Sequence, residues 1–541
     1  MNMLKLLSLE LKRLLQSRFT WLVIALTALS PVLGLILYKP ASATTMLSIY
    51  LANPAIAGGA AGGILFGVLT ICEWDRAVRH RVEVLMDAVV SPLSLALVRL
   101  SALMVCALCA FALTLLAWLP ISKGLIGAVF DLSDYALAYL LFMGLALPLG
   151  ILAAAAAYQF CRRADLALLL FAAFAALSLT LWADNWQLCW LNPCVWALSD
   201  DFSNVRIFRS VGYMRLTWLL ALSGVWTLSW LCVRQYGKGL LGSLRQNIRR
   251  SYRPAIVVIL LACSGTAYAA QPFVDHSNLD ETAMTFAELD DAEGVVCTAR
   301  SAQVFPDVQA GTLSGQASYW FVNTSGKEQV VAFGVTPGYE ISHVQANGED
   351  APFTLSDYQE YNEAKLEVTI PAEKSVEVTL DYAGFPQENR MMSTMQGSME
   401  ITGEYLCLEN AALSPRLMNV LPAGALYPTT IEITLPAQMT VIPFGDSEAT
   451  AVAHHEDGTT TWRYETGSTG GILYAGDYMR EDIAAGDQTI AFYYGRKHQE
   501  VMEDAEAVEA VKSVVDYCSE HYGPLSFGAG ETLKLIQSLY E

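Results

Sequence analysis

Four adjacent residues, His454-His455-Glu456-Asp457, carry side chains that can bind metals and transfer protons. A hydrolytic zinc site on a helix needs two His residues one turn apart and a Glu that activates water, the HExxH spacing. Adjacent His residues in a polar turn cannot supply this geometry. The sequence therefore predicts a solvated loop here, and it predicts no zinc site and no catalytic residue within the 541 residues.

The sequence contains no P-loop motif for nucleotide binding. Gly237-Lys238-Gly239 comes nearest to a phosphate-binding loop, but it lacks the GxxxxGK[ST] spacing and follows no predicted strand. If ATP drives this protein, another chain must hydrolyse it. We therefore expect no cofactor in this chain, with ATP on a partner subunit and zinc only if a catalytic domain follows.

The eleven Cys residues form no recognisable framework. Cys189 and Cys194 share one predicted loop, where they either pair or remain buried thiols. Cys297, Cys407 and Cys518 are an odd set without metal-ligand spacing. The Cys residues therefore leave the redox compartment undecided.

A charged segment, Glu73 to Leu100, lies between two long apolar stretches. Its pattern is helical and ends at a proline, so it is either an ordinary basic loop or a helix that docks on another protein. The residues that carry the pattern are Glu73, Arg76, Arg79, Arg81, Glu83, Leu85 and Pro92.

Charge divides the chain into two halves. Residues 1–270 contain 21 Lys and Arg against 11 Asp and Glu, whereas residues 271–541 contain 12 against 42. This division is typical of a membrane domain with basic cytoplasmic loops followed by an acidic globular domain. The acidity of the second half excludes a nucleic-acid site there.

Six uncharged stretches in the first half are long enough to span a bilayer core, and an amphipathic segment suited to a membrane surface precedes them. None has an ionisable residue near its middle, so an ion-coupled relay is not expected. The stretches are Phe19–Leu37, Ile49–Ile71, Leu100–Trp118, Tyr135–Tyr158, Leu166–Trp182 and Leu216–Cys232.

The loops between these stretches predict an orientation. Successive loops lie on alternating sides of the membrane. The loops on the side of the N-terminus contain 16 Lys and Arg and those on the other side contain five. Because cytoplasmic loops are the more basic, this difference predicts that the N-terminus is in the cytoplasm. We expect a multi-pass protein of the plasma membrane, surrounded by lipid, with residues 271–541 outside the cytoplasm. Small residues four apart predict close helix packing in the second stretch, at Gly58, Gly59, Gly62, Gly63 and Gly67.

The stretch that joins the halves, Leu244 to Ala270, has the layout of a secretory signal. Basic residues precede an apolar run, and Ala267-Tyr268-Ala269 forms a small-x-small site. Two interpretations stay open: a seventh span of about 16 residues, or cleavage between Ala269 and Ala270 that releases the acidic half. We favour the uncleaved span.

From Asp291 the sequence alternates short β-favouring runs with turn residues, a pattern typical of an antiparallel β-sandwich. A helical stretch, Gln499 to His521, and a last apolar run follow. The clearest predicted strands are Ser318–Val322, Gln329–Phe333, Leu366–Ile370, Val376–Leu380 and Ile431–Leu435.

The order of elements in the first half resembles that of the permease subunits of type-2 ABC exporters. These have an N-terminal amphipathic helix, six spans and a charged cytoplasmic helix between the second and third spans. The resemblance implies that Glu73–Pro92 is a coupling helix that docks on a separate ATPase. It also implies a dimer of permease units.

Ordered motifs in the second half resemble the N-terminal β-domain of the zinc aminopeptidase family that includes aminopeptidase N and leukotriene-A hydrolase. The motifs are Val344–Gly348, Tyr382–Pro386, Ile431–Gly445, Tyr474–Tyr478 and His521–Pro524. Where that family commonly has Trp-Tyr-Pro, this chain has Leu413-Ser-Pro415. The zinc-binding HExxH and its companion motifs would follow Pro524 and do not occur before Glu541.

The interpretation is thus a permease subunit of an ABC-type exporter with an extracytoplasmic aminopeptidase-like domain. The alternatives are a membrane-anchored zinc aminopeptidase whose catalytic region lies beyond this chain, and a non-catalytic surface binding module. The expected domains are a six-span domain (1–235), a basic linker with the seventh span (236–270), a linker (271–290), a β-sandwich (291–496) and the start of a truncated helical or mixed domain (497–541).

Overall fold

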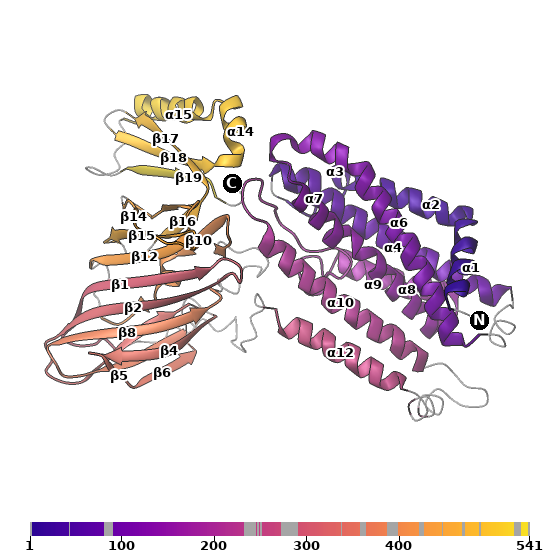
Figure 1. Ribbon diagram of the computed structural model, residues 1–541, viewed down its shortest axis with the longest axis horizontal. Coiled ribbons are helices and arrows are strands. Elements are labelled where there is room, and N and C mark those ends of the chain that lie inside the picture. The colour runs from indigo at the N-terminus through magenta and orange to yellow at the C-terminus, as the bar shows by residue number, and fades with distance from the viewer. Residues whose placement is uncertain are drawn as a thin grey trace. The chain divides into compact units, whose positions relative to one another are not determined.

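The computed structural model separates into two compact units (Figure 1). The helical unit comprises the described parts of Met1–Asp200 and Ile207–Gln271, and the β unit comprises those of Asp201–Arg206 and Pro272–Leu539. The described residues are 3–42, 44–80, 90–231, 245, 248, 252–271, 290–336, 338–357, 364–386, 399–420, 427–445, 447–467, 471–485, 488–523 and 532–538.

The helical unit is built from Leu- and Ala-rich runs, which favour helix. Its helices are α1 (Met3–Leu15), α2 (Arg18–Leu29), α3 (Val32–Ile36), η1 (Ser48–Ala52), α4 (Asn53–Arg79), α6 (Pro92–Ile126), η2 (Gly127–Val129), α7 (Leu132–Ala138), η3 (Tyr139–Gly144), α8 (Ala146–Cys161), α9 (Ala164–Leu179), α10 (Val205–Leu231) and α12 (Arg253–Ala269). Both η1 and η3 are π-helices, each continuous with the α-helix that follows.

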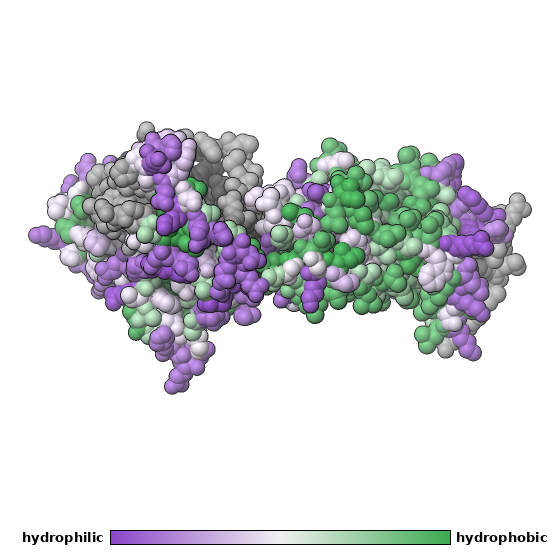
Figure 2. All heavy atoms as spheres, turned by 90° about the horizontal axis from the view of Figure 1, so that it is seen from above, coloured by the Kyte–Doolittle hydropathy of each residue, from purple (hydrophilic) through white to green (hydrophobic). Residues whose placement is uncertain are grey.

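Among the described residues, four helical segments are long and apolar enough to cross a membrane. They are Arg18–Ile36, Ser48–Arg76, Leu93–Val129 and Leu132–Cys161. Hydrophobic side chains gather over the surface of the helices (Figure 2), with Leu29, Leu116 and Leu169 each more than 60% exposed. Such a surface suits hydrocarbon rather than water, so the helical unit is consistent with membrane association.

The structure does not support the expectation of six or seven spans. Helices α9 and α12 have 16 and 17 residues, below the length of the four long segments. The sixth predicted stretch, Leu216–Cys232, lies in α10. This helix begins eleven residues before Leu216 and so includes Arg206, Arg209 and Arg215. These arginines precede the predicted stretch Leu216–Cys232 but belong to the same helix.

An eight-stranded sheet forms the largest part of the β unit, in the order β14-β15-β12-β1-β2-β8-β4-β5. Its strands are β1 (Val295–Asp307), β2 (Thr312–Asn323), β4 (Tyr339–Ala346), β5 (Glu349–Asp350), β8 (Ser375–Gly384), β12 (Thr429–Pro436), β14 (Thr450–His454) and β15 (Thr459–Thr466). Strand β1 pairs with β12 in parallel, so the sheet is not wholly antiparallel as expected.

Two four-stranded sheets supply the other side of the core. One contains β6 (Phe353–Asp357), β7 (Ala364–Ile370), β3 (Gln329–Val335) and β11 (Arg416–Leu417), and the other contains β13 (Thr440–Ile442), β16 (Ile472–Gly476), β10 (Tyr405–Glu409) and β9 (Glu400–Ile401). One hydrophobic cluster joins them to the large sheet through residues such as Tyr319, Phe333 and Leu408. All five predicted strands fall inside observed strands. Four of these strands have one buried face, and β3 is buried on both faces from Val331 to Val335.

A smaller sheet lies at the C-terminal end of the described chain (Figure 1). It consists of β17 (Tyr478–Ala485), β18 (Gln488–Gly495) and β19 (Leu533–Ile536), and β19 pairs in parallel with β18. The predicted helical stretch becomes α14 (Gln499–Asp504) and α15 (Ala507–Tyr522). Val508, Val511 and Val515 pack α15 against Ile483 and Ile490 of the sheet.

Candidate functional site

The N-terminal part of the predicted coupling segment is the end of α4. Glu73 lies there with only 8% of its side chain exposed, and its carboxylate contacts the Arg13 guanidinium of α1. Arg13 also lies 2.7 Å from Glu10 of the same helix. The first residue of the segment is thus held in a buried ionic contact with a helix sixty residues earlier in the chain.

A second ionic contact extends this group to α6. The Glu10 carboxylate, 7% exposed, lies 3.5 Å from the Nε atom of Arg99. Leu14, Trp74 and Leu103 surround these charges with apolar side chains. Burial lowers the pKa of Arg13, but the carboxylates of Glu10 and Glu73 outweigh it and hold that pKa above its usual value. The Arg13 guanidinium is therefore held between two buried carboxylates.

The next two basic residues of the segment face outward. Side-chain exposure is 51% for Arg76 and 75% for Arg79, and Arg79 pairs with Asp75 one helical turn earlier. Asp75 in turn accepts a hydrogen bond of 3.3 Å from the Tyr158 hydroxyl of α8. The end of α4 therefore presents two exposed guanidinium groups, and its contacts with α1 and α8 hold the helix in place.

The rest of the segment is only partly described. Arg81, Glu83 and Leu85 lie outside the described residues. Pro92 is the first residue of α6, and Ser91 caps that helix by accepting a hydrogen bond from the Ser94 amide. Pro92 thus starts a helix, where its missing N–H costs nothing.

The predicted packing glycines lie where α4 meets other helices. A Cβ at Gly59 would come 2.3 Å from the Phe142 carbonyl oxygen, and one at Gly63 would come 3.0 Å from that of Ala146. The corresponding neighbours are Met143 and Pro31 for Gly58, Leu147 for Gly62 and Phe171 for Gly67. Backbone and side chains thus occupy the space that larger residues would need.

Arg215 of α10 is a buried cation that the sequence did not reveal. Its guanidinium donates to the carbonyl oxygens of Leu141 and Phe142 in η3, at 2.9 Å each, and of Trp190, at 2.6 Å. The Leu191 carbonyl accepts two longer bonds. Because a π-helix leaves carbonyls outside the usual helical pattern, Arg215 ties η3 to the loop before α10. The predicted span began one residue later, so this Arg was assigned to a loop.

The predicted cleavage site lies at the end of α12. Ala269 is the last residue of that helix, and the amide of Ala270 donates to the Thr266 carbonyl as its cap. Both alanines are exposed. Helix α12 lies beside α10 (Figure 1), with Ser264 donating to the Thr217 carbonyl.

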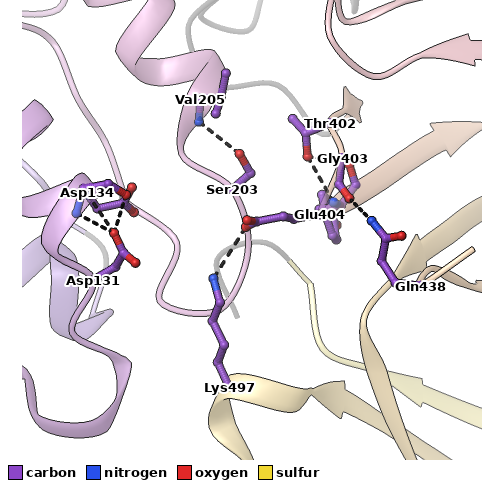
Figure 3. Close-up of polar contacts among 11 residues, drawn as sticks. Asp131, Asp134, Ser203, Val205, Thr402, Gly403, Glu404, Gln438 and Lys497 are labelled. Atoms are coloured by element: carbon purple, nitrogen blue, oxygen red, sulfur yellow. Dashed lines mark hydrogen bonds and ion pairs between the residues drawn. The ribbon is translucent and has the colours of Figure 1, made fainter. Parts of the chain in front are cut away.

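A short segment before α10 belongs to the β unit. Phe202 is buried between Tyr405 and Tyr478, with ring centroids 4.6 and 5.2 Å away, and Asp201 lies 3.0 Å from His498. Nearby, Lys497 contacts Glu404 at 3.5 Å on the surface (Figure 3), and the Thr402 hydroxyl donates a buried hydrogen bond to the Tyr405 carbonyl. The contacts of Phe202 and Asp201 hold the segment, and these described residues form no catalytic arrangement.

His454 to Asp457 form the turn between β14 and β15. The His454 and His455 rings hydrogen-bond the hydroxyls of Thr460 and Thr461 across the hairpin, at 3.0 and 2.8 Å. Hydrogen bonds from Thr459 lower the pKa of Asp457 below its usual value. Within the described ranges, no group of three or more His, Cys, Asp or Glu side chains could hold a metal ion.

Arg300 is a second buried arginine, in the core face of β1. It pairs across the sheet with Tyr319 and Thr429 and is 3% exposed. In the described part of the chain, its Nε and Nη2 atoms have no hydrogen-bond partner. Arg300 thus differs from Arg215, whose donors all reach carbonyl groups.

Three tyrosine hydroxyls in the same core hold the segment that replaces the expected Trp-Tyr-Pro. Tyr339 donates to the Ala412 carbonyl at 2.7 Å, Tyr382 to that of Leu413 and Tyr319 to that of Pro415. Burial raises the pKa of all three phenols above the usual value. They anchor α13 (Asn410–Leu413) and the residues that follow it.

Comparisons with known proteins yield structural neighbours of one class. No protein-family model matches the sequence, and no curated protein matches it. Similar solved structures include zinc metallopeptidases of the M1 family, over the C-terminal half of the chain. One is the M1 zinc metallopeptidase from Deinococcus radiodurans, at 16% identity and a TM-score of 0.31, covering 45% of this chain and 56% of that one.

A second neighbour is yeast LTA4 hydrolase in complex with bestatin. It is 10% identical with a TM-score of 0.30, and the match covers 47% of this chain and 40% of that one. The chain thus spans about half the length of the solved structures that it matches. At these scores the similarity assigns neither an activity nor a substrate.

Proposed function

We propose that this chain is the permease subunit of an ABC-type exporter, that a separate ATPase drives it, and that its β unit is an extracytoplasmic aminopeptidase-like domain. The observation that carries the proposal is the end of α4. Exposed Arg76 and Arg79 project from a helix whose Glu73 is anchored in a buried ionic group. A rigid basic surface of this kind can receive force from a partner protein.

The proposed topology has six spans and a seventh at the junction. In addition to the four long segments, α9, α10 and α12 cross the membrane. Helices of 16 and 17 residues are short for a hydrocarbon core, and local thinning of the bilayer makes them sufficient. The functional unit is a dimer of permease units in the plasma membrane, with the N-terminus in the cytoplasm.

Co-purification with a candidate ABC ATPase tests the coupling surface. Charge reversal by Arg76→Glu with Arg79→Glu should weaken the complex at least about tenfold, because it turns attraction into repulsion. The matched control is Lys39→Glu with Lys123→Glu, two exposed residues on the other side of the proposed membrane. Equal association of the two double variants with the ATPase would contradict the coupling role. Addition of Arg81→Glu to the first double variant tests the third basic residue in the same assay.

Metal analysis tests the assignment of no zinc to this chain. The purified protein should contain less than about 0.1 zinc per chain, because a structural or catalytic site binds its metal nearly stoichiometrically. One zinc per chain would show that ligands were missed. It would then favour the alternative in which the chain is part of a zinc aminopeptidase.

The intact mass of the membrane-extracted chain tests the junction. We propose that α12 remains as an uncleaved span, so mass spectrometry should find residues on both sides of Ala269 in one chain. A fragment that begins at Ala270 would show that the junction acts as a signal and that the β unit is released.

A further inference from the structure

Helix α1 contacts both stems of the proposed coupling segment. The segment leaves the end of α4 and returns at the start of α6, and each stem carries one charged residue that faces α1. Arg13 contacts Glu73 on the α4 stem, and Glu10 lies 3.5 Å from Arg99 on the α6 stem. Glu10 and Arg13 also pair with each other at 2.7 Å.

The four charges form one alternating chain across three helices. Arg99, Glu10, Arg13 and Glu73 follow one another as cation, anion, cation and anion, and Glu73 also lies 3.8 Å from Arg76 of its own helix. The two carboxylates are buried and the Arg99 side chain is 14% exposed. Separating buried charges leaves them unpaired in a poorly solvated place, which opposes sliding of α1 past either stem.

Apolar packing supports the same association. Leu14 of α1 lies with Trp74 of α4 and Leu103 of α6 around the charges. Leu6 of α1 packs beside Leu95 and Val98 of α6. Away from these contacts α1 exposes Leu4 and Leu9, by 71% and 58%, together with Lys5 and Lys12. The helix thus has one face fixed to the stems and an exposed surface that carries both leucine and lysine side chains.

We infer that Glu10 and Arg13 are positioning residues that clamp α1 to both stems, so that α1 moves together with the coupling segment when the ATPase acts. This inference rests on the proposed function for the part that involves the ATPase. The clamp transfers a displacement of the cytoplasmic loop to α1. Arg76 and Arg79 make the contact with the ATPase. Because of the clamp, a movement of the coupling segment at this contact also moves α1.

Hydrogen–deuterium exchange of the full chain in detergent tests the clamp. Arg13→Gln removes both of its ion pairs and should raise exchange of amides 3–15 about tenfold, because α1 then opens locally. Arg13→Lys keeps the charge and should stay within about threefold of the unsubstituted chain. The matched control is Arg163→Gln, which removes an exposed pair with Asp165 and should leave α1 unchanged.

The ATPase complex tests the transmission separately. Arg13→Gln should bind a candidate ABC ATPase as the unsubstituted chain does, yet lose the change in ATP hydrolysis that the permease causes, while Arg13→Lys retains it. Unchanged exchange of α1 in Arg13→Gln overturns the clamp. Raised exchange with unchanged ATP hydrolysis overturns the transmission. If the unsubstituted chain neither binds nor affects any ABC ATPase, the proposed function and the transmission are both overturned. The hydrogen–deuterium exchange of α1 still tests the clamp in that case, because it does not involve the ATPase.

Discussion

The carbonyl oxygen of Gly63 on α4 occupies the place where a side chain at Gly150 on α8 would begin. A Cβ built on Gly150 would lie 2.1 Å from that oxygen and 2.7 Å from its carbon. The two helix backbones are in contact at this crossing. A side chain at Gly150 would therefore displace backbone atoms of α4 and not a flexible side chain. Close contact of this kind is how membrane helices gain packing energy.

Substitution of Gly150 by Ala should therefore destabilise the helical unit. We expect a loss of about 3 kcal/mol, since overpacking against backbone cannot be relieved by a rotamer change. Thermal unfolding of the detergent-solubilised chain measures it. Gly124→Ala in α6 is the matched control, because nothing lies within 4 Å of its Cβ position and Ala favours helix. Similar losses for the two variants would contradict the close crossing.

Substitution of Arg215 by Met should also destabilise the helical unit. The carbonyls of Leu141, Phe142, Trp190 and Leu191 would lose their donor inside the protein. Each unsatisfied group costs about 1–3 kcal/mol, so a total loss of at least about 3 kcal/mol is expected. The same unfolding assay applies. Arg163→Met, at an exposed position, serves as control, and a neutral result at Arg215 would show that these bonds do not matter.

The same replacement at Arg300 should have the opposite sign. Its charge is buried and two of its nitrogen atoms lack partners among the described residues, so Met should stabilise the β unit by about 1–3 kcal/mol. Unfolding of the full chain, followed by circular dichroism at β-sheet wavelengths, measures this. Arg463→Met, whose side chain is 49% exposed beside Glu432, is the control. A loss of stability at Arg300 would mean that the guanidinium has a stabilising partner.

The buried phenols predict a loss of stability at alkaline pH. Burial raises the folded pKa of Tyr319, Tyr339 and Tyr382 above the unfolded value of 10.0. Their neutral forms therefore stabilise the fold below pH 10, and this contribution falls as pH rises through and above that value, where only the unfolded phenols ionise.

Phenolate absorbance near 295 nm, recorded together with circular dichroism, checks this expectation. These three tyrosines should ionise only when the β signal is lost, so part of the absorbance should appear together with unfolding. Tyr382→Phe should reduce that part and leave the rest unchanged. Complete ionisation of all tyrosines in a chain that retains its β signal would contradict the buried hydroxyl bonds.

The sequence predicted those elements whose patterns are local. Alternating residues such as Leu366, Val368 and Ile370 identify β7, because every second residue is buried. The long apolar runs likewise predicted the four helical segments that are long and apolar enough to cross a membrane. Gly63 was expected at a helix contact, but its partner Gly150 was not, since nothing in the sequence indicates which helices touch.

Features that depend on distant partners were missed. Arg215 and Arg300 look like surface cations in the sequence, and only the carbonyls around one and the tyrosines around the other reveal that they are buried. The ionic group at Glu73 unites three segments of different helices, so the sequence showed a charged loop without its anchor. The break between α2 and α3 at Pro31 could have been read locally, because Pro lacks the N–H that continues a helix.

The parallel pairing of β1 with β12 has a consequence for how the protein is made. Gln303 of β1 hydrogen-bonds Glu432 of β12, 129 residues later in the chain. One edge of β1 therefore stays open until the residues between the two strands, and β12 itself, have been synthesised. Closing so long a loop is slow, and an open strand edge invites pairing with other chains. During folding, β1 therefore stays exposed to pairing with other chains until β12 has been synthesised.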